Sequence, residues 1–255
     1  MPSSLQVVAS RRGRVAPALA LATALALVTL IGTGGAHDVL DDPPALVPME
    51  FVAPPPGSYV LHAIMPAPEG RVLDLDGQRR PLSSFTSGKI TLLGFIYTSC
   101  PDARGCPLAY QVFHAVRHRV AEHRELRGRV RLVSLSFDPA RDTPARMRAY
   151  AGGLPRAGVE WALLTTESPR TLLPLLDGFG QDVRVEHDAR GRATGPFSHT
   201  LKVFLIDARG IVREIYTPSY LYPDVILNDI ATLRMEETGH ARPRSASTSG
   251  PQAEP

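Results

Sequence analysis

Two long apolar runs and one helical stripe dominate the hydrophobic pattern. Residues 89–97 (KITLLGFIY) form a continuous apolar run, which is typical of strands buried on both faces, and the mainly apolar run 130–137 (VRLVSLSF) predicts a second buried strand. Between them, apolar residues recur at helical spacing, namely at Ala109, Val112, Phe113, Val116 and Val120. This stripe predicts a helix from Pro107 to about His123.

Caps and turns mark the other elements. Thr143-Pro144 and Ser168-Pro169 each join a capping residue to a first-turn proline, so we expect helices to begin there. A turn is expected at Asp76-Gly77 between short extended runs, and a strand within EWALLTT (160–166). A hairpin is expected around ARG (208–210), followed by a closing helix over 222–236. Strands that alternate with helices predict an α/β domain with a central sheet.

The first 36 residues resemble an export signal. Arg11, Arg12 and Arg14 precede 22 uncharged residues, and acidic residues follow from Asp38. This charge order predicts that the bulk of the chain is exported. The segment 1–36 is therefore a cleaved signal peptide or a membrane anchor, because 22 uncharged residues are also enough to span a bilayer.

Composition divides the rest of the chain. Residues 37–69 are proline-rich, which predicts a linker or extended arm. Residues 70–238 contain the periodic hydrophobic pattern and form the predicted domain. Residues 239–255 are rich in Ser, Pro and Gly, which predicts a disordered tail. The net charge of +3 comes from the leader, since the remainder carries 25 basic and 25 acidic residues. This balance argues against a nucleic-acid partner.

Both cysteines of the chain lie in TSCPDARGCP (98–107). Cys100 follows the first buried strand and Cys106 directly precedes the helix. Ligands gather beyond the carboxyl ends of strands in open α/β sheets, and a helix amino terminus lowers the pKa of a thiol. The position therefore suits a redox couple or a metal site, although in an exported protein a structural disulfide is also expected.

Three segments resemble the Sco/SenC family of thioredoxin-fold copper proteins in order and spacing: FIYTSCPDARGCPLAYQVF, SLSFDPARDTPARMRAYA and FSHTLKVFLIDARG. The resemblance covers about residues 70–236. By motif, Cys100 and Cys106 match the family's cysteine pair, His199 its downstream histidine, and Asp138 the aspartate of its DP-x-RDTP segment. The usual C-x3-C is lengthened here to C-x5-C. Loop closure costs little more at this length, but the ligand geometry and redox potential are expected to differ.

The resemblance implies a thioredoxin-like fold, a central mixed sheet flanked by helices, at the periplasmic face of the inner membrane or free in the periplasm. It implies a metallochaperone rather than an enzyme, in which Cys100, Cys106 and His199 bind copper and Asp138 supports the site. The implied partner is the copper-site subunit of cytochrome c oxidase, or another copper or thiol protein. The residue types agree, because two thiolates and one imidazole suit Cu(I).

Other readings of these residues remain open. Structural zinc would need a fourth ligand, for which Asp102 is a candidate, although it is equally a turn residue. The Cys100/Cys106 pair could instead serve a thiol-disulfide oxidoreductase, which a C-x2-C spacing would favour more strongly. A structural disulfide in a binding module is the third alternative. We interpret His114 and His118, one helical turn apart, as part of a solvated face.

Overall fold

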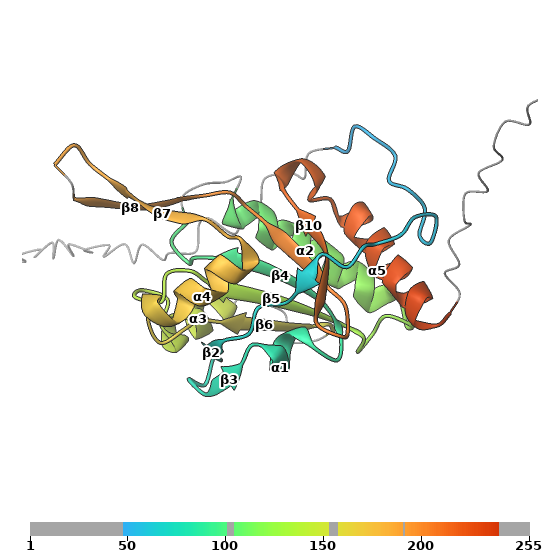
Figure 1. Ribbon diagram of the computed structural model, residues 1–255, viewed down its shortest axis with the longest axis horizontal. Helices are drawn as coiled ribbons and strands as arrows, with labels where there is room; N and C mark the ends of the chain where they lie inside the picture. The colour runs from blue at the N-terminus through green and yellow to red at the C-terminus, as the bar shows by residue number, and fades with distance from the viewer. Residues whose placement is uncertain (1–47, 101–104, 153–157, 191, 240–255) are drawn as a thin grey trace, which may run out of the picture. The chain divides into compact units, whose positions relative to one another are not determined.

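The computed structural model describes residues 48–100, 105–152, 158–190 and 192–239, so the leader lies outside the described residues. Six strands form one sheet in the order β1-β10-β9-β4-β5-β6 (Figure 1). Their bounds are β1 Met65–Pro66, β4 Ile90–Ile96, β5 Val130–Ser136, β6 Glu160–Leu164, β9 Val203–Ile206 and β10 Ile211–Tyr216. Strands β4, β5 and β6 are parallel, whereas β9 is antiparallel to β4 and β10. The predicted central mixed sheet is confirmed.

The four long helices begin at the predicted residue or within one residue of it. They are α2 Cys106–Glu122, α3 Pro144–Ala151, α4 Pro169–Phe179 and α5 Pro223–Glu237. The Thr143 side chain accepts a hydrogen bond from the Arg146 N–H (3.3 Å), and the Ser168 hydroxyl accepts one from the Thr171 N–H (3.2 Å). Each cap satisfies a backbone donor that has no partner within the helix.

Alternate residues of each buried strand face two separate cores. Leu92 and Leu132 pack with α2 and α5 on one side of the sheet. Leu93 and Val133 pack with α3 and α4 on the other. Because side chains alternate along a strand, a sheet covered on both faces needs the continuous apolar runs that the sequence contains.

The smaller elements include one that the hydrophobic pattern did not reveal. The predicted turn at Asp76-Gly77 joins β2 (Arg71–Leu73) to β3 (Arg79–Pro81), followed by the short helix α1 (Ser83–Thr86), and a 3₁₀ turn, η1 (Pro218–Tyr220), precedes α5. The unpredicted element is a second hairpin, β7 (Val183–His187) with β8 (Ala193–His199), which pairs as a separate two-stranded sheet (Figure 1). Across the described ranges, no helix is long and apolar enough to cross a membrane.

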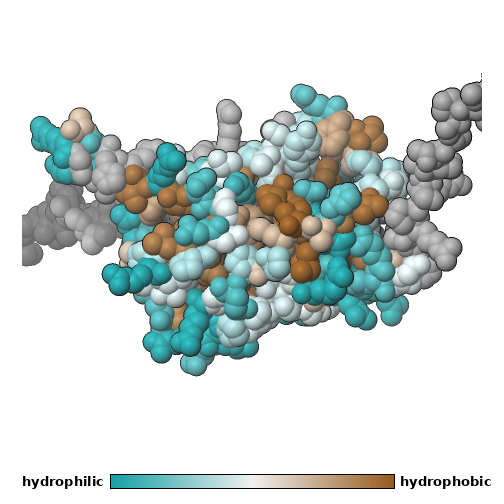
Figure 2. Space-filling view, viewed as in Figure 1, coloured by the Kyte–Doolittle hydropathy of each residue, from teal (hydrophilic) through white to brown (hydrophobic). Residues whose placement is uncertain are grey.

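The described part of the proline-rich segment is extended and packs against the domain. Strand β1 pairs with β10, and Leu61 is only 4% exposed. The Tyr59 hydroxyl donates to Asp229 (2.5 Å) and the Gly57 N–H to Thr232 (2.9 Å), both on α5. Its outward-facing hydrophobic residues are Phe51, Val52, Val60 and Ile64. Figure 2 shows that hydrophobic residues on the drawn face form several groups separated by polar ones.

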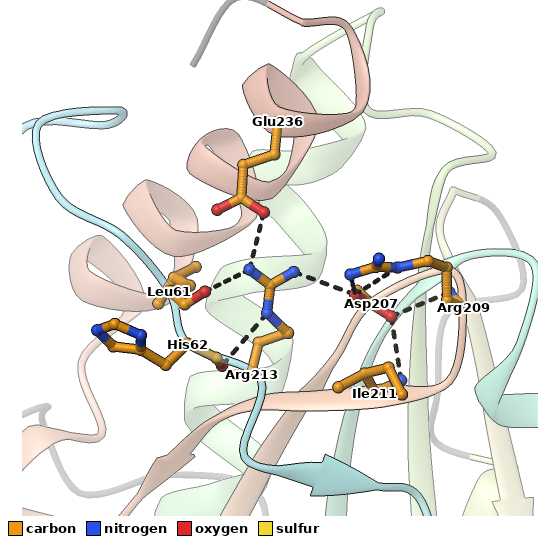
Figure 3. Close-up of polar contacts among 7 residues, drawn as sticks. All are labelled: Leu61, His62, Asp207, Arg209, Ile211, Arg213 and Glu236. Atoms are coloured by element: carbon orange, nitrogen blue, oxygen red, sulfur yellow. Dashed lines mark hydrogen bonds and ion pairs between the residues drawn. The ribbon is translucent and has the colours of Figure 1, made fainter. Parts of the chain in front are cut away.

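A buried arginine joins this segment to the sheet and to α5. The Arg213 guanidinium donates to the backbone carbonyls of Leu61 and His62, and forms ion pairs with Asp207 (3.1 Å) and Glu236 (2.8 Å) (Figure 3). Arg213 is 7% exposed. A buried guanidinium requires several acceptors, and here three separate parts of the chain supply them.

Candidate metal centre

The structure brings the two predicted sulfur ligands together. Cys100 follows the end of β4, and Cys106 is the first residue of α2. Cys106 is buried and Cys100 is partly exposed. Both are thiols that no disulfide joins, and the two side chains are hydrogen-bonded to each other. The lengthened loop therefore still allows the sulfurs to meet, although Asp102 lies outside the described residues.

The environment of Cys106 reverses one expectation. Its hydrogen bond with Cys100 raises the pKa of the Cys106 thiol, and burial raises it further. The N–H groups of Tyr97 and Cys106 act in the opposite direction but are outweighed. The expected lowering of this pKa at the start of the helix was therefore wrong for Cys106, because desolvation and the neighbouring sulfur dominate over the helix terminus.

Three aromatic rings pack in the same hydrophobic cluster as the cysteine pair. Tyr97, 4% exposed, directly follows β4, and its ring centroid lies 4.9 Å from that of Phe137 and 5.2 Å from that of Phe197. Burial raises the pKa of Tyr97, and the neighbouring Cys100 raises it further. The Tyr97 side chain is hydrogen-bonded to Cys100 and to the backbone of Phe197.

The predicted imidazole lies close to this aromatic group. His199 is the last residue of β8 and is half-buried. Its ring centroid is 4.8 Å from that of Phe137 and 6.5 Å from that of Tyr97. Within the part of the chain that the structure describes, no three His, Cys, Asp or Glu side chains form a group that could hold a metal ion. Tyr97 thus contacts both His199 and the cysteines, but the three predicted ligands are not in coordinating positions.

The hairpin that carries His199 has a sequence signal that the hydrophobic pattern alone does not reveal. The tetrapeptide Asp-Ala-Arg-Gly occurs at 188–191 and again at 207–210. The second copy supported the predicted β9–β10 hairpin, and the first lies between β7 and β8. A search for repeated turn sequences would have found the strand on which His199 lies.

Asp138, the predicted supporting residue, is buried at 5% exposure and forms an ion pair with Arg141 (3.0 Å). Its backbone N–H donates to the Ser136 hydroxyl (3.0 Å), and that hydroxyl donates to Asp142 (2.6 Å). These bonds connect Asp138 to the cysteine loop only indirectly.

Asp142 makes the direct contact, which the sequence reasoning missed. Its carboxylate accepts from both the N–H (3.0 Å) and the hydroxyl (2.5 Å) of Thr98, two residues before Cys100. Asp142 is 1% exposed, and Arg146 donates to the Thr98 hydroxyl from the solvent side (3.2 Å). A buried carboxylate with three donors holds its partners firmly, so Asp142 fixes the start of the cysteine loop.

The helical histidine pair is split between two environments. The His114 ring lies 4.4 Å from the Tyr110 ring and 5.0 Å from that of Trp161 between centroids, and burial lowers its pKa. His118 is exposed and faces Glu122 (3.5 Å). The predicted solvated face is therefore wrong for His114, because Trp161 of the neighbouring strand β6 covers it.

The sequence matches a known family model over most of the domain. The model, described as SCO1/SenC, matches residues 71–234. No curated protein sequence matches the chain.

Solved structures with the same fold are similar along most of their own length. Copper-bound ScoI of Arabidopsis thaliana has a TM-score of 0.56 and 20% identity, covering 66% of this chain and 97% of that one. A SCO1/SenC family lipoprotein from Bacillus anthracis has a TM-score of 0.53 and 22% identity, covering 72% and 99%. Copper-bound yeast Sco1 has a TM-score of 0.52 and 15% identity, covering 70% and 98%. The thioredoxin-like fold implied by the resemblance is confirmed.

Proposed function

The chain belongs to the SCO1/SenC family, and from this premise we propose that it is an exported or membrane-anchored copper-binding protein. Cys100, Cys106 and His199 hold one copper ion, and the protein assists assembly of the copper centre of cytochrome c oxidase. The copper is cargo, passed by ligand exchange to the thiols of the oxidase's copper-site subunit or of another copper protein.

The pairing of the two thiols is the observation that supports this proposal most directly. Five residues separate Cys100 from Cys106 in the sequence, yet their side chains are hydrogen-bonded to each other. They lie at the carboxyl end of β4, the usual position of a binding site in such sheets. Relatives of the same fold from Arabidopsis and yeast are described with copper bound.

The donor set fits Cu(I) better than the other common metals. Two thiolates and one imidazole are soft ligands, and Cu(I) binding requires the cysteines to be reduced and deprotonated. His199 packs against Phe137 and Tyr97, and among the described residues it forms no metal-holding group with the two cysteines. Metal binding therefore requires a rearrangement that brings the imidazole to the two thiolates.

An anaerobic Cu(I) titration of the reduced full chain in detergent tests the proposal. We expect one tightly bound copper per chain, lost in Cys100→Ser and in Cys106→Ser, and weakened in His199→Ala. The matched control is His118→Ala, which removes an exposed imidazole from α2 and should leave the affinity unchanged.

Two results would contradict the proposal. Absence of tight binding in the reduced wild type would exclude the copper function. Equal affinity in His199→Ala and wild type would remove His199 from the ligand set while leaving the thiols in it.

The site of action is a further part of the proposal. We expect the domain on the periplasmic side, either anchored by the N-terminal segment or released after cleavage. A protease added to spheroplasts should then digest the domain without lysis, and carbonate extraction separates the anchored form from the released one. Protection of the domain until lysis would contradict export.

A second candidate function is favoured by the unequal exposure of the two cysteines. Cys100 is partly exposed and Cys106 is buried, the arrangement of an attacking and a resolving thiol. The Cys100 thiolate would attack a partner's disulfide and release one partner thiolate. Cys106, on losing its proton, would then displace the second, leaving a Cys100–Cys106 disulfide and a reduced partner.

Trapping distinguishes this function from copper transfer. With a small disulfide as substrate, Cys106→Ser should accumulate a mixed disulfide at Cys100, and Cys100→Ser should accumulate none. If the wild-type disulfide, once formed, resists reduction at potentials where glutathione and thioredoxin act, the pair is a structural disulfide instead.

A further inference from the structure

Tyr97 lies between the two halves of the candidate site. It directly follows β4, three residues before Cys100, and is 4% exposed. Its ring packs against Phe137 after β5 and Phe197 in β8. These contacts hold the ring in one place, so the position of its hydroxyl is set by the packing around it.

The Tyr97 hydroxyl has two partners on different segments. One is the Cys100 side chain, and the other is the backbone N–H of Phe197, two residues before His199 on β8. A phenol can donate one hydrogen bond and accept another. Here it donates to the sulfur and accepts from the N–H, and so connects the loop of one proposed ligand to the strand of another.

We propose that Tyr97 is a positioning residue of the candidate metal centre, whose hydroxyl sets the placement of Cys100 relative to the strand that carries His199. The copper part of this inference rests on the proposed function, whereas the effect on the thiols does not. A tyrosine that only filled the core would need its ring but not these two bonds.

The hydroxyl also affects the balance between thiols and disulfide. Oxidation by glutathione disulfide removes two protons and two electrons from Cys100 and Cys106, forms their disulfide and yields two glutathione thiols. The bond from Tyr97 favours the reduced pair, in which the Cys100 sulfur accepts it. Removing the bond therefore favours the disulfide and lowers the reduction potential.

Tyr97→Phe tests the proposal because it keeps the ring and removes only the hydroxyl. In glutathione buffers, we expect the equilibrium constant for oxidation of the cysteine pair to rise about five-fold, a potential change of about −20 mV at 29.6 mV per tenfold. In competition with a chromophoric Cu(I) chelator, we expect the copper affinity to fall about ten-fold, as for residues that orient metal ligands. In a His199→Ala background, Tyr97→Phe should lower the copper affinity by a smaller factor, because part of its effect depends on the position of His199 on β8.

Tyr216→Phe is the matched control. Its hydroxyl is buried and donates to Asp229 (2.6 Å) on α5, so the same atom is lost from the core at a position whose hydrogen-bond partner is not a cysteine. We expect this variant to lose stability but to keep the wild-type potential and copper affinity. Thermal unfolding shows whether each variant is folded.

The measurements separate failure of this inference from failure of the proposed function. A folded Tyr97→Phe variant with wild-type potential and copper affinity would overturn the positioning role. If the wild type binds no Cu(I), the copper function fails and the potential alone decides: a five-fold change supports the role of Tyr97 at Cys100, and an unchanged value refutes it. An equal affinity loss with and without His199 would refute the connection through β8.

Discussion

Two turns of this protein share the tetrapeptide Asp-Ala-Arg-Gly and the same local hydrogen bonds. In the β7–β8 turn, Asp188 accepts from the N–H groups of Arg190 (2.8 Å) and Arg192 (2.9 Å). In the β9–β10 turn, Asp207 accepts from those of Arg209 and Ile211 (both 3.0 Å). An aspartate can bond to the backbone that follows it whatever surrounds the turn, so equal sequences produce equal turns.

Their surroundings differ. Asp207 has a side chain 6% exposed and faces the buried Arg213 as well as Arg209, whereas Asp188 is 30% exposed and pairs with the exposed Arg192. Strand β9 lies between β10 and β4, whereas the β7–β8 sheet has two strands. The aspartate of one turn is therefore buried against Arg213, whereas the other turn is stabilised mainly by its own bonds. The histidine of the candidate site belongs to the second hairpin.

The largest loss of stability is expected from replacing Arg213, the buried partner of Asp207 in the β9–β10 turn. Arg213→Met removes the partner of Asp207 and Glu236 and the donor to Leu61 and His62. We expect the free energy of unfolding in urea to fall by up to about 3–5 kcal/mol, because a buried ion pair is broken, the carbonyls of Leu61 and His62 lose their donor, and Asp207 keeps only Arg209 as a cationic partner. Arg192→Met, at the exposed turn, should change it little. Similar losses in both variants would contradict the distinction between the turns.

The second largest effect is expected in the hydrogen-exchange rates of the two hairpins. We expect backbone amides of β7 and β8 to exchange at least about 100-fold faster than those of β9 and β10, since a two-stranded sheet opens locally at low free energy. Mass spectrometry of peptic peptides measures this. Addition of Cu(I) to the reduced protein should slow exchange around His199 if that residue is a ligand. Equal exchange in both hairpins would show that β7–β8 is held more firmly than its contacts suggest.

The same substitution in both turns should give unequal losses with the same dependence on pH. Burial alone would raise the pKa of Asp207, but bonds from Arg209, the Ile211 N–H and Arg213 outweigh it and lower that pKa. At pH 7, Asp207→Asn should cost about 1.5–3 kcal/mol of unfolding free energy, the range for hydrogen bonds to charged groups. Asp188→Asn should cost less.

The sign of the pH dependence follows from the lowered pKa. Ionised Asp207 stabilises the fold fully above its unfolded pKa of about 4, and this stability is lost as pH falls through the lower folded value. The difference between wild type and Asp207→Asn should therefore shrink below about pH 4. A difference that grows on acidification would contradict the role of the charged form. Urea unfolding from pH 2 to 7 measures it.

The smallest change is expected on the cysteine side of the candidate site. Thr98→Val removes the hydroxyl that bonds to Asp142 but keeps the side-chain shape, and should cost about 1 kcal/mol of unfolding free energy. Thr98→Ser keeps the hydroxyl and should be close to wild type. Equal losses for both would point to packing of the Thr98 methyl group instead. Because Asp142 holds this loop, the variant should speed the alkylation of Cys100 by iodoacetamide.

Several features were predictable because they depend on neighbours in the chain. The caps Thr143 and Ser168 and the turn at Asp76-Gly77 are formed by residues a few positions apart. The β7–β8 hairpin was missed because its signal is a repeated turn rather than an apolar run. The role of Asp142 was missed because its partner Thr98 is 44 residues away.

The sequence by itself determined the buried strands, the helix starts, the family and the pairing of Cys100 with Cys106 across a helix start. Only the tertiary structure decided which of two identical turn sequences has a buried aspartate, that the thiol of Cys106 is disfavoured as a thiolate, and that Tyr97 contacts both Cys100 and His199. Periodicity and capping depend on residues close in the chain. Burial and charge compensation depend on residues brought together from distant segments, which a local pattern does not specify.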